Sequence, residues 1–243
     1  MDFVVALQFL TMIPVTINRA VESRDIAKAM AYFPVIGLLI GILTAGVYTL
    51  LIPVLAAPVC DLIAVAFMII ITGNMHGDGL MDSADGLFSG KPRERVLEIM
   101  RDSRNGSHGV TAGILVILAR FVLLGQIAPE FKWQALVLVP AIGRWGQVYC
   151  ATLYDYARTG GGTGGFTEYV GIREISWASL TVLIPAIFLL QMKSVILVVT
   201  VLAGTAFMGR YMSRKIGGVT GDTLGAINEL AEVFALIALQ IIL

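Results

Sequence analysis

Charge and cysteine are both scarce in this chain of 243 residues. Only 14% of the positions are charged, and 17 basic side chains are balanced by 17 acidic ones. That balance excludes the basic surface on which nucleic-acid binding depends, so we expect no nucleic-acid partner. The two cysteines, Cys60 and Cys150, lie in or beside apolar stretches. A disulfide framework or a thiolate metal site therefore has no support, and we expect both thiols to pack in the interior.

The basic start of a cleaved signal peptide is also lacking. Asp2 stands where a signal peptide carries a basic residue, and the apolar run from Phe3 is broken at Pro14. We therefore expect residues 3–17 to form an interfacial or partly inserted helix.

Apolar side chains are what the chain has in excess. They make up 57% of the residues, with a mean hydropathy of +0.85, and they gather into stretches of about the 20 residues that a helix needs to cross a bilayer. Continuous apolar runs such as 195–207 lack the period-two alternation of barrel strands. We therefore predict an all-α, polytopic membrane bundle of about seven transmembrane helices, with six as the alternative count, in a single domain over residues 1–243. The predicted spans are 29–51, 54–72, 110–127, 133–153, 177–192, 194–210 and 224–243.

The basic residues between these spans are unevenly distributed. With the N-terminus inside, the outside turns hold only Lys132 and Lys193, and most other basic residues fall inside. The positive-inside rule favours that orientation, which predicts a multi-pass protein of a prokaryotic cytoplasmic (inner) membrane with its active site facing the cytoplasm. Arg120 and Arg144 fall within predicted spans. Because an unpaired charge in lipid is costly, both should face the bundle interior or mark a wrong boundary.

The most informative polar segment, residues 73–109, carries Asp78, Asp82 and Asp85. Their i,i+4 and i,i+3 spacing places all three carboxylates on one face of a helix that continues from the second predicted span. Like charges so close destabilise a helix unless a cation neutralises them. Mg²⁺ commonly takes one or two carboxylates together with phosphate oxygens of a substrate, so the pattern predicts a magnesium site.

Glycines flank these carboxylates, and a second helix is expected after them. Gly79 and Gly86 lack side chains, so we expect them to let a phosphate-bearing substrate approach the backbone. A helix is expected over residues 92–104, with Glu98 and Asp102 again four apart. We count Asp102 with the candidate metal ligands and Glu98 with the candidate substrate-binding residues.

Two arginines of the same segment suit phosphate. The guanidinium groups of Arg101 and Arg104 match phosphate oxygens with paired donors, so we expect both to bind substrate. A structural role and a catalytic role are equally open for His76. The alternative interpretation of residues 73–109 is a solvated loop whose acidic and basic side chains balance one another.

A second signal lies in residues 217–232. Asp222 precedes a helix that carries Asn228 and Glu229, and polar residues on an apolar helix should point into the bundle. We expect these three residues to bind substrate, against the alternative that Thr220 or Asp222 caps the helix and Asn228 makes interhelical hydrogen bonds. The glycine-rich residues 160–165 fit a flexible loop over a site at least as well as a phosphate cradle, because they lack the lysine and the following Ser or Thr of a P-loop.

Five blocks of this sequence resemble the cobalamin synthase family, also called adenosylcobinamide-GDP ribazoletransferases, across nearly the full length. They are LQFLTMIP at 7–14, FPVIGLLIG at 33–41, HGDGLMDSADGLFSG at 76–90, LEIMRDSRNGSHG at 97–109 and GGVTGDTLGAINELAE at 217–232. Gly77 stands where that family often has a larger apolar residue, a departure that touches no candidate ligand.

The resemblance implies a magnesium-dependent transfer between two substrates, adenosylcobinamide-GDP and α-ribazole or its 5'-phosphate. The ribazole hydroxyl would attack the cobinamide-linked phosphate and expel GMP. Asp78, Asp82 and Asp85 would hold one or two magnesium ions, and His76, Asp82 or Asp85 would act in catalysis, with Asp85 or His76 favoured as the base. Self-association and association with other enzymes of the corrinoid pathway are compatible with this assignment.

Three rival classes share part of the pattern. CDP-alcohol phosphotransferases also carry D-x-x-D-G, but their continuation differs from the Leu87-Phe88-Ser89-Gly90 found here. Membrane prenyltransferases usually have two aspartate-rich motifs. A cation transporter would place carboxylates near the midplane of several spans, whereas these cluster at one edge.

Overall fold

A computed structural model of the protein describes residues 1–158 and 165–243, so residues 160–164 of the glycine-rich segment lie outside the described residues. The described chain is helical, and Tyr156 and Val219 form an isolated parallel β-bridge. The predicted all-α class is confirmed. In chain order, the elements are α1 (Asp2–Leu10), α2 (Ser23–Ala29), η1 (Met30–Tyr32), α3 (Phe33–Leu51), α4 (Ala57–Ile71), α5 (Met75–Leu87), α6 (Arg93–Ile99), α7 (Ser107–Gly125), η2 (Pro129–Phe131), α8 (Lys132–Leu153), η3 (Gly165–Tyr169), α9 (Ile172–Leu190), η4 (Gln191–Lys193), α10 (Ser194–Ile216) and α11 (Gly221–Ile242).

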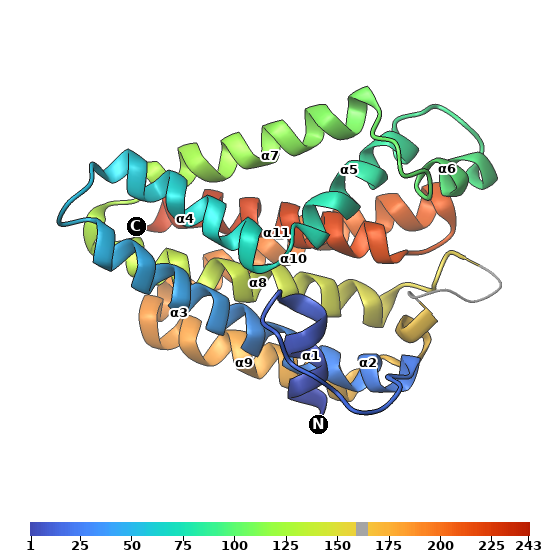
Figure 1. Ribbon diagram of the computed structural model, residues 1–243, viewed down its shortest axis with the longest axis horizontal. Helices are drawn as coiled ribbons and strands as arrows, with labels where there is room; N and C mark the ends of the chain where they lie inside the picture. Colours follow the sequence, from blue (N-terminus) through green and yellow to red (C-terminus); the bar gives the residue numbers. More distant parts are fainter. Residues whose placement is uncertain (159–164) are drawn as a thin grey trace.

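The long helices α3, α4 and α7 to α11 run roughly along the long axis of the molecule (Figure 1). Within the described ranges, four segments are long and apolar enough to cross a membrane, or five if the bent pair α4 and α5 forms one span. Those four segments are Ser23–Leu51, Ser107–Gly125, Ile172–Ile216 and Gly221–Ile242. The chain is therefore a multi-pass membrane protein, and the count of seven crossings stays a prediction.

Exposed apolar side chains cover the outer surfaces of these helices. Ile114 and Leu118 of α7 and Ile184 and Phe188 of α9 are all exposed, at 51% or more of their surface. Water-soluble proteins rarely expose large contiguous apolar surface, whereas lipid tails accept it. The interior is formed around α8, which is buried along most of its length and packs closely against α3 and α11.

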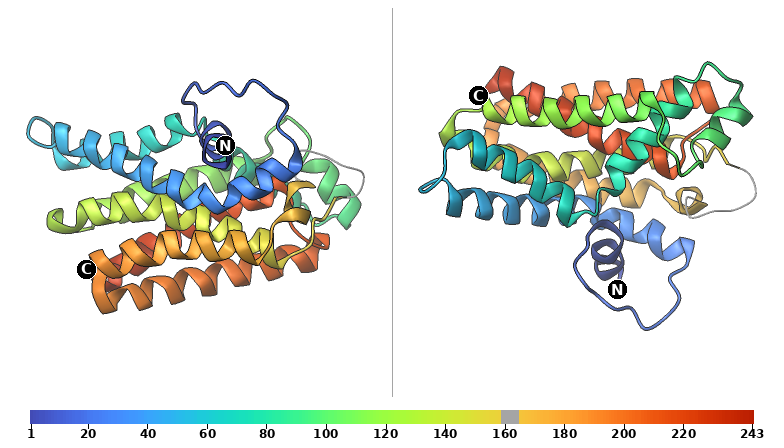
Figure 2. Two further views of the ribbon diagram at one scale, coloured as in Figure 1. Left: turned by 90° about the horizontal axis from the view of Figure 1, so that it is seen from below. Right: turned by 45° about the horizontal axis from the view of Figure 1, so that its top comes forward.

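The polar segments gather at one end of the bundle. In Figures 1 and 2, α2, α5 and α6 lie at this end, whereas the C-terminus and the turn between α9 and α10 lie at the other. Figure 2 shows α1 standing off to one side of the bundle. The helix expected over residues 3–17 ends at Leu10, and the chain is non-helical from there to Glu22.

A sharp break separates α4 from α5. The two helix axes differ by 86°, and the break contains Gly73 and Asn74, both with positive φ (60° and 57°). Two successive residues in the left-handed region cannot continue a right-handed helix. The backbone N–H of Met12 donates to the Ile71 carbonyl at 2.7 Å, which satisfies one of the free carbonyls at the end of α4. The expected continuous helix from the second span through the aspartates is therefore wrong, although all three aspartates do share the single helix α5.

Candidate active site where α5 meets α11

Two glycines allow α5 and α11 to cross backbone against backbone. A β-carbon added at Gly79 would lie 2.8 Å from the Asp222 carbonyl oxygen, and one at Gly225 would lie 3.2 Å from the His76 carbonyl oxygen. This close approach places the start of α11 beside the carboxylates of α5. On the side of Gly79 that faces α11, the space expected for a phosphate is therefore filled by the α11 backbone. Gly79 also lines a cavity that is described below.

Gly86 also serves helix packing. A β-carbon there would collide with the Met100 side chain and approach the Val96 carbonyl to 3.0 Å. The space at Gly86 is therefore occupied by α6 and the residue that follows it, and the expected approach of a substrate to this glycine is not supported.

Asp222 enters the site with a cationic partner. Thr220 is the N-cap of α11: its hydroxyl oxygen accepts from the Thr223 N–H at 3.2 Å, and the Thr223 hydroxyl accepts from the Thr220 N–H at 2.7 Å. Because Thr220 caps the helix, Asp222 is left to accept a hydrogen bond from Arg158 at 2.6 Å. The alternative that Asp222 is the cap is wrong.

The segment that carries Arg158 is tied to α11 by backbone bonds. Val219 donates to the Asp155 carbonyl at 2.8 Å, and Ala157 donates to the Val219 carbonyl at 2.9 Å. Gly217, with φ of 82°, ends α10 in the left-handed conformation that commonly follows a helix. These contacts fix Arg158 beside the first turn of α11.

Negative charge is concentrated around Asp82. We treat α5 as lying outside the spanning segments, because its 13 residues are too few and too polar to cross a bilayer alone. Partial burial and the charges of Asp78, Asp222 and Asp85 together raise the pKa of Asp82 to about 6, against the opposing charge of Arg158. Four carboxylates from two helices therefore share one electrostatic environment, and a cation would stabilise all of them.

Asp85 has a second role that the sequence did not indicate. Its two carboxylate oxygens accept from the backbone N–H groups of Gly106 at 2.6 Å and Gly109 at 2.8 Å. Gly106 is the N-cap of α7 and Gly109 lies in its first turn, so Asp85 satisfies free donors at that helix start. Both glycines are needed, because a β-carbon at either would collide with Asp85. Asp85 therefore anchors the start of α7. That Asp85 is also a metal ligand or the catalytic base stays a prediction.

The donor set fits magnesium only with help from a substrate. In the described parts of the chain, no three His, Cys, Asp or Glu side chains converge closely enough to hold a metal ion by themselves. Magnesium usually takes one or two carboxylates and completes its shell with water and substrate phosphates. Asp78, which is exposed, and Asp82, which is half-buried, lie one turn apart on α5 and meet that requirement.

The predicted second helix is shorter than expected, which changes its contacts. α6 ends at Ile99. Asp102 pairs with Arg104 at 2.8 Å on the surface, and this pairing lowers its pKa to about 2, while Glu98 pairs with Arg95 at 2.7 Å. The geometry therefore gives no support to Asp102 as a metal ligand or to Arg104 as a free phosphate donor.

Arg101 does line a polar hollow of about 250 Å³ between α6 and the segment that precedes residue 159. Two further arginines line it: Arg93, which donates to the Ala157 carbonyl at 2.8 Å, and Arg158. Glu98 lies at the same hollow. Arg93 and Arg158 were missed by the sequence reasoning, and no local motif marks either of them.

A second, mostly apolar cavity of about 330 Å³ opens beside the carboxylates. Its polar lining residues are His76, Asp78, Gln147 and Asp222. Its apolar walls come from elements far apart in the chain: Phe9, Met30, Phe33, Met75, Phe166 and Leu224. The structure thus brings His76 to the same cavity as Asp78 and Asp222. The aromatic walls were not foreseen, because each belongs to an otherwise ordinary apolar run.

Asn228 and Glu229 lie elsewhere, in a buried ion network. Arg120 pairs with Glu229 at 2.9 Å and with Glu232 at 2.6 Å, and Arg144 pairs with Glu232 at 2.8 Å. The Asn228 amide donates to Glu232 at 3.0 Å. The prediction that Arg120 and Arg144 face the bundle interior is confirmed. The geometry favours a structural role for Asn228 and Glu229 over the expected contact with substrate.

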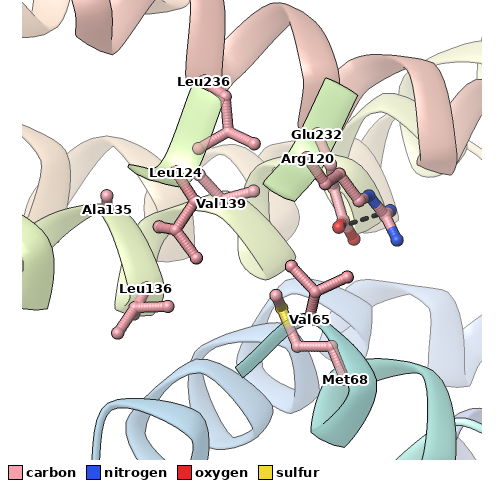
Figure 3. A pocket seen from close by; sticks show the side chains of 9 residues that line it. All are labelled: Val65, Met68, Arg120, Leu124, Ala135, Leu136, Val139, Glu232 and Leu236. Carbon is pink, nitrogen blue, oxygen red and sulfur yellow. Dashed lines mark hydrogen bonds and ion pairs between the residues drawn. The ribbon is translucent and has the colours of Figure 1, made fainter. Parts of the chain in front are cut away.

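Apolar side chains enclose one side of this network. Figure 3 shows the Arg120–Glu232 pair beside Val65 and Met68 of α4 and Leu236 of α11. These residues line a hollow with a volume of only about 10 Å³. A buried ion pair that is shielded in this way is stable only while every charge keeps its partner.

Comparison with known proteins identifies the family. The family model described as cobalamin-5-phosphate synthase matches residues 2–240. A protein of Caldanaerobacter subterraneus named adenosylcobinamide-GDP ribazoletransferase is 40% identical over 98% of this chain and 97% of its own length. Proteins of the same name from Clostridium acetobutylicum and Desulforamulus reducens are 38% and 34% identical, over 99% and 95% of this chain and 96% and 92% of their own lengths. No solved structure matches the chain. With this match from end to end, the chain belongs to the cobalamin-5-phosphate synthase family.

Proposed function

We propose that this membrane enzyme joins adenosylcobinamide-GDP to α-ribazole or its 5'-phosphate, giving adenosylcobalamin or its 5'-phosphate and GMP. The match to ribazoletransferases over the whole chain carries this assignment. In the reaction, a ribazole hydroxyl oxygen forms a bond to the cobinamide-linked phosphorus. The phosphoanhydride bond breaks, and GMP leaves with the bonding electron pair.

Magnesium is the proposed cofactor, held by Asp78 and Asp82. When bound, it would neutralise the diphosphate and the charge that develops on the departing phosphate. The support is the concentration of carboxylates at the junction of α5 and α11, which, after partial burial, contributes to the raised pKa of Asp82. Asp222, held by Arg158 at 2.6 Å, adds to the negative field that attracts the cation.

The hollow lined by Arg93, Arg101 and Arg158, whose three positive charges outnumber those of Glu94 and Glu98 in the same lining, is the proposed site of the nucleotide phosphates. Guanidinium groups match phosphate oxygens with paired donors and stay charged at any physiological pH. Arg158 touches both this hollow and Asp222, so it would lie between the leaving nucleotide and the carboxylates.

His76 is the proposed acceptor of the hydroxyl proton. It lines the same cavity as Asp78, and its Nε2 is buried without a hydrogen-bond partner among the described residues. A proton acceptor must reach the attacking hydroxyl and must not be committed to another donor. Asp85, by contrast, already accepts two backbone hydrogen bonds.

The polar end of the bundle is proposed to face the cytoplasm of a prokaryote, because the positive-inside rule places segments rich in Lys and Arg there. A cysteine at Lys91, which is exposed near α6, should react with an impermeant reagent only from the cytoplasmic side. A cysteine at Lys193, exposed at the opposite end, should react from the outside. Cys60 and Cys150 are buried and would first be replaced. Labelling of both positions from one side would contradict this orientation.

Product formation tests the proposed reaction. Purified protein in nanodiscs, given adenosylcobinamide-GDP, ribazole and Mg²⁺, should release GMP and form a corrinoid with a complete nucleotide loop, detected by mass spectrometry. A chelator should stop the reaction, and added Mg²⁺ should restore it. GMP release without a joined corrinoid, or no product at all, would refute the assignment.

A further inference from the structure

We propose that the cavity between α5, α8 and α11 binds the planar, largely apolar base of the acceptor, the dimethylbenzimidazole ring of ribazole. This inference rests on the proposed function and assigns one of its two substrates to a particular place.

The walls of the cavity suit a flat aromatic ligand. Phe9 stacks on Phe33 with ring centroids 5.8 Å apart, and Phe166 meets Phe9 edge-on at 6.0 Å. Met30 and Met75 line the cavity beside them. Aromatic rings and thioethers pack well against a planar bicyclic base. The volume of about 330 Å³ lies at the lower end of the range usual for small-ligand pockets and is too small for a corrin ring with its side chains.

The charges at the cavity exclude the other substrate groups. No Lys or Arg is among its lining residues in the described chain, whereas Asp78 and Asp222 both line it. An anionic nucleotide or a lipid phosphate in the cavity would meet two carboxylates and no basic side chain, and the proposed Mg²⁺ at Asp78 would be its one counter-charge, which is less favourable than a site lined by arginines. The nucleotide instead has the arginine hollow on the other side of Arg158. The guanine base would follow its phosphates to the arginine hollow, which leaves this cavity for the neutral base of the acceptor.

One polar side chain in the cavity is available to orient such a base. Gln147 of α8 is only 5% exposed, and its Oε1 has no hydrogen-bond partner in the parts of the chain that the structure describes. A buried amide without a partner is costly, so a ligand that bonds to it gains affinity and a fixed orientation. The ring nitrogen of a benzimidazole accepts one hydrogen bond. With the Gln147 amide turned so that Nε2 takes the place of the unpartnered Oε1, its N–H would donate that bond.

The position of the cavity fits the reaction. Asp78 and Asp222 belong both to its lining and to the carboxylate cluster. A base held against the phenylalanine rings would therefore leave its ribose at the carboxylates, where the hydroxyl has to attack.

Gly221 offers a way to fill the cavity without disturbing the fold. It lines the cavity at the start of α11, and a β-carbon there would meet no atom within 4 Å. We expect Gly221→Leu to raise the KM for ribazole by at least about tenfold, as when a pocket loses room for several atoms. The KM for adenosylcobinamide-GDP and the thermal midpoint should not change. Gly46→Leu is the matched control, because Gly46 of α3 also has open space around it and lies outside the cavity lining.

A second variant keeps the test decisive if Gly221→Leu folds poorly. Gln147→Leu removes a buried amide whose oxygen has no partner, so it should leave stability intact or raise it while raising the KM for ribazole.

A rise in the KM for the GDP-activated donor, or an unchanged KM for ribazole in these variants, would overturn the proposal. Loss of a bound lipid on native mass spectrometry, with both KM values unchanged, would do so too. Failure of the wild-type protein to make product would instead refute the proposed function.

Discussion

Replacing Asp82 by asparagine is expected to lower turnover by about 10²–10³-fold, the scale of losing a group that stabilises charge in the transition state. Asp82 lies at the centre of the carboxylate cluster, where the negative charges of Asp78, Asp222 and Asp85 disfavour its ionised form. The amide keeps the shape of the side chain but loses the charge that binds a hard cation. Steady-state turnover at saturating Mg²⁺ measures the effect.

Folding must be separated from chemistry in that experiment. Because the substitution removes a repelled carboxylate, the thermal midpoint of Asp82→Asn should equal or exceed that of the wild-type protein. Glu130→Gln is a suitable control, since Glu130 is exposed in η2, far along the chain from the cluster, and should leave turnover unchanged. Full turnover of Asp82→Asn would remove the α5 carboxylates from the mechanism.

Replacing Glu232 by alanine is expected to destabilise the protein by about 3–5 kcal/mol, because a buried charge is left without its partner. Glu232 is 3% exposed and pairs with both Arg120 and Arg144, and Arg120 alone would retain a partner in Glu229. Unfolding in detergent, followed by tryptophan fluorescence, measures the loss. A large drop in stability would separate this network from the catalytic cluster, whose variants should keep their stability.

A compensating change tests the same argument from the other direction. Loss of Glu232 leaves the Arg144 guanidinium without its carboxylate partner, and Arg144→Met removes that unpaired cation. The double variant Glu232→Leu with Arg144→Met should therefore regain much of the lost stability. If Glu232→Ala alone were as stable as the wild-type protein, the network would not hold the bundle together.

The helices and the acidic helix could be predicted because their signals are local. Apolar runs indicate where the helices lie. A lone charge in lipid is costly, so Arg120 and Arg144 were predicted to face the bundle interior, and their ion pairs with Glu232 confirm that prediction. The break between α4 and α5 also had a local signal in Gly73 and Asn74, a pair that tolerates the left-handed conformation. It was missed because the apolar run before it suggested one continuous helix.

The partners of the site residues could not be predicted, because they come from distant parts of the chain. Arg158 and Asp222 are 64 positions apart, and the tie between Asp155 and Val219 that brings them together is a tertiary contact. Gly79 was expected to face a ligand, yet part of its space is taken by the α11 backbone. A glycine shows that something approaches closely, and only the fold tells whether that is a substrate or another helix.

Electron paramagnetic resonance of Mn²⁺ is the most direct test of the claim that the α5 carboxylates hold the catalytic cation. With adenosylcobinamide-GDP present, the wild-type protein should show the spectrum of bound Mn²⁺, and Mg²⁺ should displace it. In Asp82→Asn that bound signal should be lost while the protein stays folded. An identical Mn²⁺ spectrum in both proteins would contradict the account and place the metal elsewhere.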